Sequence, residues 1–193
     1  LGAHINNINN FLVITGDPIP SMVRSSVKSV FNFDSVGLMN IISDMNQDQF
    51  ADKPVIYGGA INQGRVNFKV ELARVKKKME AGATFFMTQP VFSDEDISRL
   101  RQIKEETGAR ILCGIMPFVS LRNATFMKNE MTGINVTDEI LARYSADMTK
   151  EEGEETGIQI AKEIITKTSD FVDGYYFSFP FNRVHMLEKI LNA

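Results

Sequence analysis

The chain has 193 residues, 44% of them hydrophobic and 23% charged, which is an ordinary composition for one globular domain with a buried core. Its formal net charge of -3 argues against nucleic acid as a partner, because contacts to many phosphates need a concentrated basic surface. One cysteine and two widely separated histidines exclude an internal disulfide and a zinc site of the usual spacing, and no apolar run reaches the roughly 20 residues that span a bilayer, so we expect a cytoplasmic protein without a bound metal.

Apolar runs and amphipathic stretches alternate along the whole chain. The apolar runs predict strands at residues 11–15, 54–58, 84–88, 110–115 and 172–178. The amphipathic stretches predict helices at residues 19–30, 35–47, 68–81, 93–107, 120–130, 137–146, 151–168 and 182–192. This alternation is typical of a parallel sheet covered by helices, and an open doubly wound sheet or a (β/α) barrel would both satisfy it.

Several helix ends are marked by single residues. Ser93 is a predicted N-cap, with Asp96 three positions later and acidic side chains in the first turn. Gly82 and Gly108 are predicted to follow the last turns of two helices, because glycine readily adopts the left-handed conformation found there. An apolar run follows each of them at once, so the connections from helix to strand are expected to be short.

The loops that follow the predicted strands hold the residues of chemical interest. In both candidate architectures these loops gather at the carboxyl ends of the strands. In FLVITGDPIP at 11–20, Asp17 comes directly after a buried strand, where it either caps a turn before Pro18 or serves a ligand. Later loops read TQPVF, GIMPF and FSFPFNR. No Gly-x-Gly-x-x-Gly motif follows a strand, which argues against a Rossmann dinucleotide site.

The predicted helix at 68–81 carries charged residues at helical spacing. Glu71, Arg74 and Lys78 lie three and four positions apart, so they share neighbouring faces, and Lys77 adds a further cation. Two interpretations are open at this point. The residues form either a solvated helix face or a group of cations that meets the diphosphate of a cofactor.

Four stretches resemble the methylenetetrahydrofolate reductases, and the match covers nearly the whole chain in the right order. They are ITGDP at 14–18, AGATFFMTQPVF at 81–92, GIMP at 114–117 and GYYFSFPFNR at 174–183. A fifth stretch, FDSVGLM at 33–39, is most similar to the bifunctional bacterial form, in which the reductase follows a homocysteine S-methyltransferase domain.

The resemblance implies an α/β fold of the (β/α)8 TIM-barrel type. The five predicted strands would be barrel strands four to eight, so residues 1–193 would be the C-terminal part of a single reductase domain that lacks its first three βα units. An incomplete barrel leaves two strand edges open and lacks the glutamate that serves the family as general acid. We therefore expect weak or no activity from this chain alone, and association into a homo-oligomer or swapped dimer.

The resemblance also implies an activity. The family binds FAD, takes a hydride from NAD(P)H and reduces 5,10-methylenetetrahydrofolate to 5-methyltetrahydrofolate, in one-carbon metabolism and methionine biosynthesis. Two other functions stay open: a flavin-free barrel lyase or pterin-binding transferase, and a non-catalytic interaction fragment. Binding of FAD would separate the first function from both alternatives.

Residue roles follow from the same resemblance. Asp17 would be the catalytic residue, because its charge would tune the flavin. Gln89, Leu121 and Arg183 would bind the folate substrate. Some members have a phenylalanine at the position of Leu121, and Phe118 is a candidate to replace it. The residues implied in binding FAD are Thr15, Gly16, Asp17, Phe33, Ser35, Tyr57, Asn62, Glu71, Arg74, Lys77 and Lys78.

Overall fold

Five parallel strands form a single sheet in the computed structural model, which describes residues 1–16, 19, 22, 25–28, 30, 32–131 and 133–192. The strands are β1 (Asn10–Val13), β2 (Ile56–Ile61), β3 (Phe85–Pro90), β4 (Ile111–Ile115) and β5 (Gly174–Phe177). Their order in the sheet is the same as their order in the chain. A doubly wound sheet reverses its strand order at a switch point, and these five strands show no such reversal.

The helices alternate with the strands as the sequence predicts. They are α1 (Gly2–Ile5), α2 (Ser35–Gln47), α3 (Phe68–Glu80), α4 (Asp94–Thr107), α5 (Leu121–Glu130), α6 (Asp138–Ala142), α7 (Lys150–Thr168), α8 (His185–Leu191) and the 3-10 turn η2 (Pro180–Asn182). The helix predicted at 19–30 falls partly on residues outside the described ranges, and none of its described residues is α-helical. Inspection of the described helices shows none with both the length and the apolar character to cross a membrane.

The predicted boundaries of α4 are confirmed. The Ser93 hydroxyl accepts the backbone N–H of Asp96 at 3.0 Å, so it satisfies one of the free donors of the first turn. At the other end Gly108 has φ of 67°, the left-handed conformation that ends the helix. Gly82, with φ of 93°, follows α3 in the same way.

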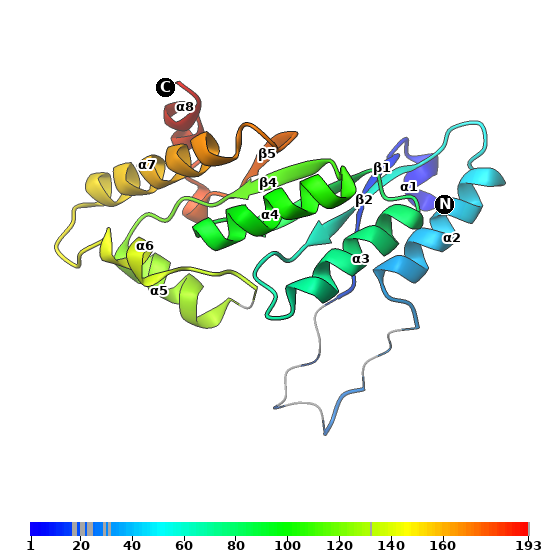
Figure 1. The fold of residues 1–193 in the computed structure, drawn as a ribbon, viewed down its shortest axis with the longest axis horizontal. Coiled ribbons are helices and arrows are strands. Elements are labelled where there is room, and N and C mark those ends of the chain that lie inside the picture. Colours follow the sequence, from blue (N-terminus) through cyan, green and yellow to red (C-terminus); the bar gives the residue numbers. More distant parts are fainter. Residues whose placement is uncertain are drawn as a thin grey trace.

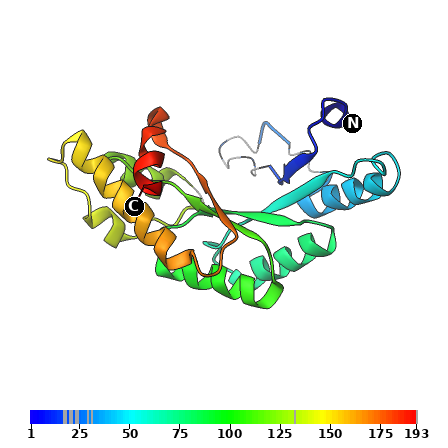
Figure 2. The ribbon, with the colours of Figure 1, turned by 90° about the horizontal axis from the view of Figure 1, so that it is seen from above.

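Helices cover one face of the sheet. Figure 2 shows α3 and α4 on one side of the strands, while the chain ends α1 and α8 lie on the other side. Alternate residues of β3 follow this division, because Phe86, Thr88 and Pro90 are buried, whereas the residues between them are only half-buried. The face away from α3 and α4 is called the open face below. Its β1 and β2 side chains Leu12 and Ile56 remain 42% and 51% exposed.

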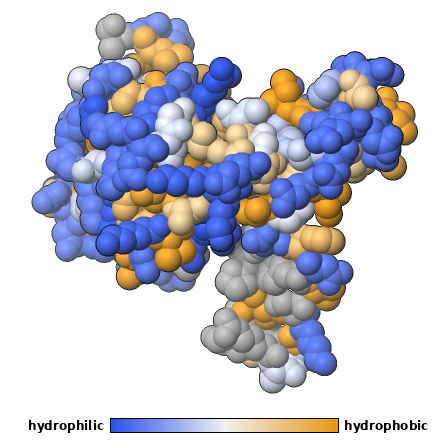
Figure 3. Space-filling view, turned by 45° about the vertical axis from the view of Figure 1, so that its right-hand side comes forward, coloured by the Kyte–Doolittle hydropathy of each residue, from blue (hydrophilic) through white to orange (hydrophobic). Residues whose placement is uncertain are grey.

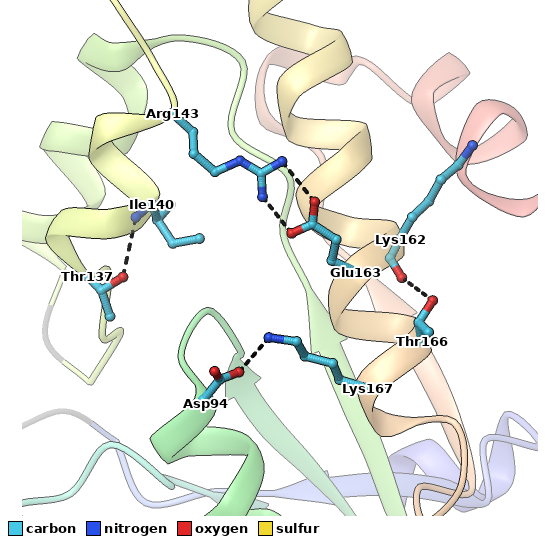
Figure 4. A network of polar contacts seen from close by, with 8 residues as sticks. All are labelled: Asp94, Thr137, Ile140, Arg143, Lys162, Glu163, Thr166 and Lys167. Carbon is cyan, nitrogen blue, oxygen red and sulfur yellow. Dashed lines mark hydrogen bonds and ion pairs between the residues drawn. The ribbon is translucent and has the colours of Figure 1, made fainter.

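Helix α7 is held closely against the segment that follows β4. A Cβ atom at Gly157 would lie 2.0 Å from the carbonyl oxygen of Phe118, and one at Gly153 would lie 2.3 Å from that of Val119. Only glycine permits this approach of helix and backbone. Figure 4 shows that ion pairs also join α7 to its neighbours: Glu163 pairs with Arg143 beside α6 at 2.5 Å, and Lys167 pairs with Asp94 of α4 at 2.6 Å.

Candidate functional site

The connection between β1 and α2 contains the first group of predicted residues. The Thr15 hydroxyl accepts the backbone N–H of Ser35 at 2.8 Å, so the end of β1 lies beside the start of α2. Gly16 is exposed and Phe33 is 60% exposed. Asp17, the predicted catalytic residue, lies outside the described residues. The structure therefore brings Thr15 and Ser35 together and leaves the Phe33 ring free for contacts.

Apolar side chains are exposed along the same connection, whose described residues extend away from the sheet (Figure 1). Met22 and Val30 are 90% and 81% exposed. Figure 3 shows apolar residues, in orange, on the part that projects from the rest of the molecule. An apolar ligand surface such as a ring system would find partners here.

At the end of β2, Asn62 occupies a position that suits a ligand contact. Its backbone N–H donates to Glu71 at 2.9 Å. Its side-chain oxygen is buried and has no hydrogen-bond partner among the described residues. A buried acceptor without a partner is costly, so a donor from a ligand would stabilise this position.

Tyr57 lies elsewhere. It is near the start of β2, at the opposite end of the strand from Asn62, and its side chain is only 3% exposed. Its hydroxyl donates to the carbonyl of Ala81 at 2.7 Å and touches Gly82, at the end of α3. The resemblance implies that Tyr57 contacts the flavin. In the structure Tyr57 is a core residue that fixes the end of α3.

The charged residues of α3 are divided between two sides of the helix. Glu71 is 3% exposed and contacts Arg65 at 3.5 Å in addition to the backbone of Asn62. The Lys78 ammonium group donates to the carbonyl of Ala60 at 2.5 Å. Burial lowers the pKa of Lys78 from its usual value, and the nearby Glu71 opposes this shift. These two side chains tie α3 to the end of β2.

Arg74 and Lys77 lie on the outer side of α3. They line a shallow hollow of about 510 Å³ together with Asn67 and Lys69. The hollow is open and carries three cations, so it is accessible to an anionic group, in contrast to the position of Lys78. The helix face that the sequence presented as one group is thus two groups in the structure.

At the end of β3, the backbone of Gln89 is paired with a residue that the sequence did not single out. The Gln63 side chain donates to the Gln89 carbonyl at 2.9 Å and accepts the Gln89 N–H at 3.1 Å. Gln63 is almost fully buried. The only sequence signal for a role of Gln63 was its position just after β2, in INQG at 61–64. Because Gln63 satisfies the backbone, the side-chain amide of Gln89 keeps all its hydrogen bonds free of the described residues.

Aromatic rings lie over glycines on the open face. The ring of Tyr176 lies over Gly114, where a Cβ atom would come within 2.6 Å of its hydroxyl, and that hydroxyl donates to the carbonyl of Thr88, the residue before Gln89, at 2.5 Å. Phe85 lies in the same way over Gly58, at the other end of β3 from Gln89. The glycines therefore make room for flat side chains on this face, one of which is close to Gln89.

A cavity of about 900 Å³ lies between α5, the start of α7 and η2. It is lined by both Leu121 and Arg183, which were predicted to bind substrate, together with Arg122, Lys150 and the rings of Phe126 and Phe181. Phe181 is 76% exposed and has φ of 54°, a conformation rare for a residue with a bulky side chain. Gln89 is not among the residues that line this cavity.

The comparisons with known proteins point to one family. A family model described as methylenetetrahydrofolate reductase matches residues 2–192. A solved structure described as an uncharacterized protein from Clostridium thermocellum that binds two copies of 5-methyl-5,6,7,8-tetrahydrofolic acid is similar, with a TM-score of 0.54 and 16% identity over 82% of this chain. This likeness concerns the fold, and the chain spans 57% of the length of that protein. A search of curated proteins found no match.

Proposed function

Because the chain belongs to the methylenetetrahydrofolate reductase family, we propose that it takes part in the FAD-dependent reduction of 5,10-methylenetetrahydrofolate by NAD(P)H. The product would be 5-methyltetrahydrofolate, used in one-carbon metabolism and methionine biosynthesis. The observation that carries the proposal is the family match over residues 2–192. The folate ligand of the structural neighbour agrees with it.

We further propose that residues 1–193 are strands four to eight of a (β/α)8 barrel in a single reductase domain. Three features support this: the strands follow chain order, α3 and α4 cover one face, and Leu12 and Ile56 remain exposed on the open face. In a barrel that face would be covered by the remaining strands. FDSVGLM at 33–39 favours a bifunctional parent protein with a homocysteine S-methyltransferase domain.

The strands β1 and β5 form the two open edges of the sheet, which affects how the chain assembles. Within the described residues each of these strands pairs on one side only. Unpaired edges and an exposed apolar face favour association, so the chain alone is expected to form a homo-oligomer or swapped dimer. We also propose that these five βα units by themselves turn over slowly, because the resemblance places the family's general acid near the end of the first barrel strand.

Two groups of residues fit FAD, one at the carboxyl end of β2 and the other on the outer side of α3. Asn62 offers a buried acceptor without a partner, and Arg74 and Lys77 offer accessible cations for a diphosphate. Thr15, Gly16, Phe33 and Ser35 would line the ring and its side chain. When bound, FAD supplies the redox chemistry, in which a hydride from NAD(P)H is passed on to the folate.

Among the remaining predicted residues, the Gln89 side chain is free to bind a ligand, whereas Glu71 and Lys78 are already paired. The Gln89 amide has one acceptor and two donors, which suits the edge of a pterin ring, and the Tyr176 ring, hydrogen-bonded to the residue before it, would help to exclude water. Asp17 would tune the flavin by its charge. Glu71 and Lys78 would reach the cofactor only by exchanging their present contacts with the backbone of β2 and Asn62.

The experiment is a titration of the purified chain with FAD, followed by fluorescence quenching. Lys77→Met removes one of the accessible cations but keeps the apolar stem, and Lys76→Met is the matched control, because Lys76 pairs with Glu106 on the exposed side of α3. We expect Lys77→Met to weaken FAD binding and Lys76→Met to leave it unchanged. A wild-type chain that binds a folate but no FAD would support the flavin-free alternative instead.

A further inference from the structure

Arg183 is held at the edge of the cavity by a carboxylate on α7. Its Nε atom lies 2.7 Å from Oε1 of Glu154. The other oxygen of Glu154 lies 2.9 Å from Nε2 of His185, so the carboxylate is held from both sides. The two terminal nitrogens of Arg183 make no hydrogen bond or ion pair with the described residues. One side of the guanidinium group is thus used, and the other is free.

The cavity favours negative charge. Arg122, Lys150 and Arg183 line it, and none of the described aspartates or glutamates does. Glu154 itself lies outside the lining, where its side chain is only 16% exposed. An anionic group in the cavity would meet three cations, while the Glu154 carboxylate is already paired with Arg183 and His185.

Glu154 occupies a rigid position. It lies between Gly153 and Gly157, the two residues whose missing side chains let α7 pack on the carbonyls of Val119 and Phe118. These carbonyls belong to the segment that enters the cavity wall after β4. Any rotation of α7 would drive its backbone into that segment, so the carboxylate is presented to Arg183 from a fixed support.

We propose that Glu154 is a positioning residue for ligand binding. It holds Arg183 by Nε, so that the two terminal nitrogens can receive an oxyanion of the ligand. A guanidinium group binds carboxylate and phosphate through paired N–H groups, and holding it in one orientation reduces the entropy lost on binding. This inference rests on the proposed function and on the role that the resemblance implies for Leu121 and Arg183, which would make this cavity the place where substrate binds. The oxyanion would be a carboxylate of the folate or a phosphate of the nicotinamide dinucleotide.

A different role for Glu154 predicts the opposite result. If the carboxylate only neutralised Arg183, then removing it would raise the positive potential of the cavity and strengthen the binding of any anion. Glu154→Ala and Glu154→Gln would then act in the same direction. If Glu154 positions Arg183, alanine abolishes the support, whereas glutamine keeps the shape and an oxygen that can contact Nε.

The test is an NMR titration of the full chain with two pairs of probes that differ in the oxyanion. One pair is p-aminobenzoylglutamate and p-aminobenzamide, and the other is adenosine 5'-monophosphate and adenosine. We expect Glu154→Ala to weaken binding of the anionic member of one pair about tenfold, as expected for loss of an oriented charge-assisted contact. Glu154→Gln should restore most of that loss. The pair that responds identifies the source of the oxyanion.

Two controls separate positioning from general damage. Glu151→Ala removes a carboxylate from the exposed first turn of the same helix, so it should leave binding unchanged. In an Arg183→Ala background, Glu154→Ala should have no further effect on binding. Tighter or unchanged binding in Glu154→Ala, or failure of both anionic probes to bind the wild-type chain better than their uncharged partners, would overturn the inference. The FAD titration depends on α3, so failure of the proposed function would be seen separately.

Discussion

Substitution of Gly157 by alanine tests how closely α7 is packed. Alanine favours a helix by about 1 kcal/mol over glycine, so an unconstrained position would be stabilised. Here the added Cβ atom would lie 2.0 Å from the Phe118 carbonyl oxygen, and because real Cβ atoms stay beyond 3.0 Å, the helix or the segment must move by about 1 Å. Overpacking of this kind costs typically 1–3 kcal/mol and here acts on backbone, which cannot rotate away. Because the clash is with backbone, the upper part of this range applies, about 2–3 kcal/mol, which less the helix gain leaves a net destabilisation of about 1–2 kcal/mol.

The assay is urea unfolding followed by far-ultraviolet circular dichroism, with Gly37→Ala as the matched control. Gly37 is also a helical glycine, but its Cβ atom would meet the exposed ring of Phe33 at 3.2 Å, and that ring can move. Gly37→Ala should therefore be neutral or stabilising by up to about 1 kcal/mol. If Gly157→Ala proved as stable as the wild type with an unchanged denaturant slope, the close contact between α7 and Phe118 would be disproved.

Two further predictions concern buried ionisable groups. Asp96 is fully buried and neither of its carboxylate oxygens has a hydrogen-bond partner among the described residues, so burial raises its pKa above the usual 3.8. The folded state therefore binds the Asp96 proton more tightly than the unfolded state does. The contribution of this proton to the free energy of unfolding is lost as the pH rises through the folded-state pKa. Asp96→Asn should remove the loss of stability that the wild type shows in urea unfolding as the pH rises above 3.8, and a dependence on pH as steep as that of the wild type would contradict the assignment. Burial raises the pKa of Cys113 to about 12, so the native thiol should not react with a disulfide reagent at neutral pH and should react after unfolding. Rapid reaction of the native chain would show that Cys113 is accessible.

The sequence predicted the site unevenly, and the reason is geometric. Gln89 lies at the end of β3, where a residue's place follows from the order of elements, whereas Arg183 lies six positions beyond β5, after η2. The structure encloses Tyr57 near the start of β2, and residue type alone could not indicate this, because the face and depth of a strand residue depend on the register of the strand. Gln63 and Glu154 were missed because their roles depend on partners 26 and 29 positions away, as the pairs Gln63–Gln89 and Glu154–Arg183 show.

Local patterns in the sequence were sufficient to indicate the family, the five parallel strands and most of the helices, although α1 was not predicted and none of the described residues in the helix predicted at 19–30 is α-helical. The apolar periodicity, the Ser93 cap and Gly108 act within a few residues, so they can be read without the fold. Only the tertiary structure decided which polar groups are already paired within the protein and which are free to bind a ligand. Glu71 and Lys78 are used to join α3 to β2, whereas Arg74, Gln89 and the terminal nitrogens of Arg183 remain free of the described residues. Burial and hydrogen bonding depend on contacts between elements that are far apart in the chain, so they cannot be predicted from residue spacing along one helix.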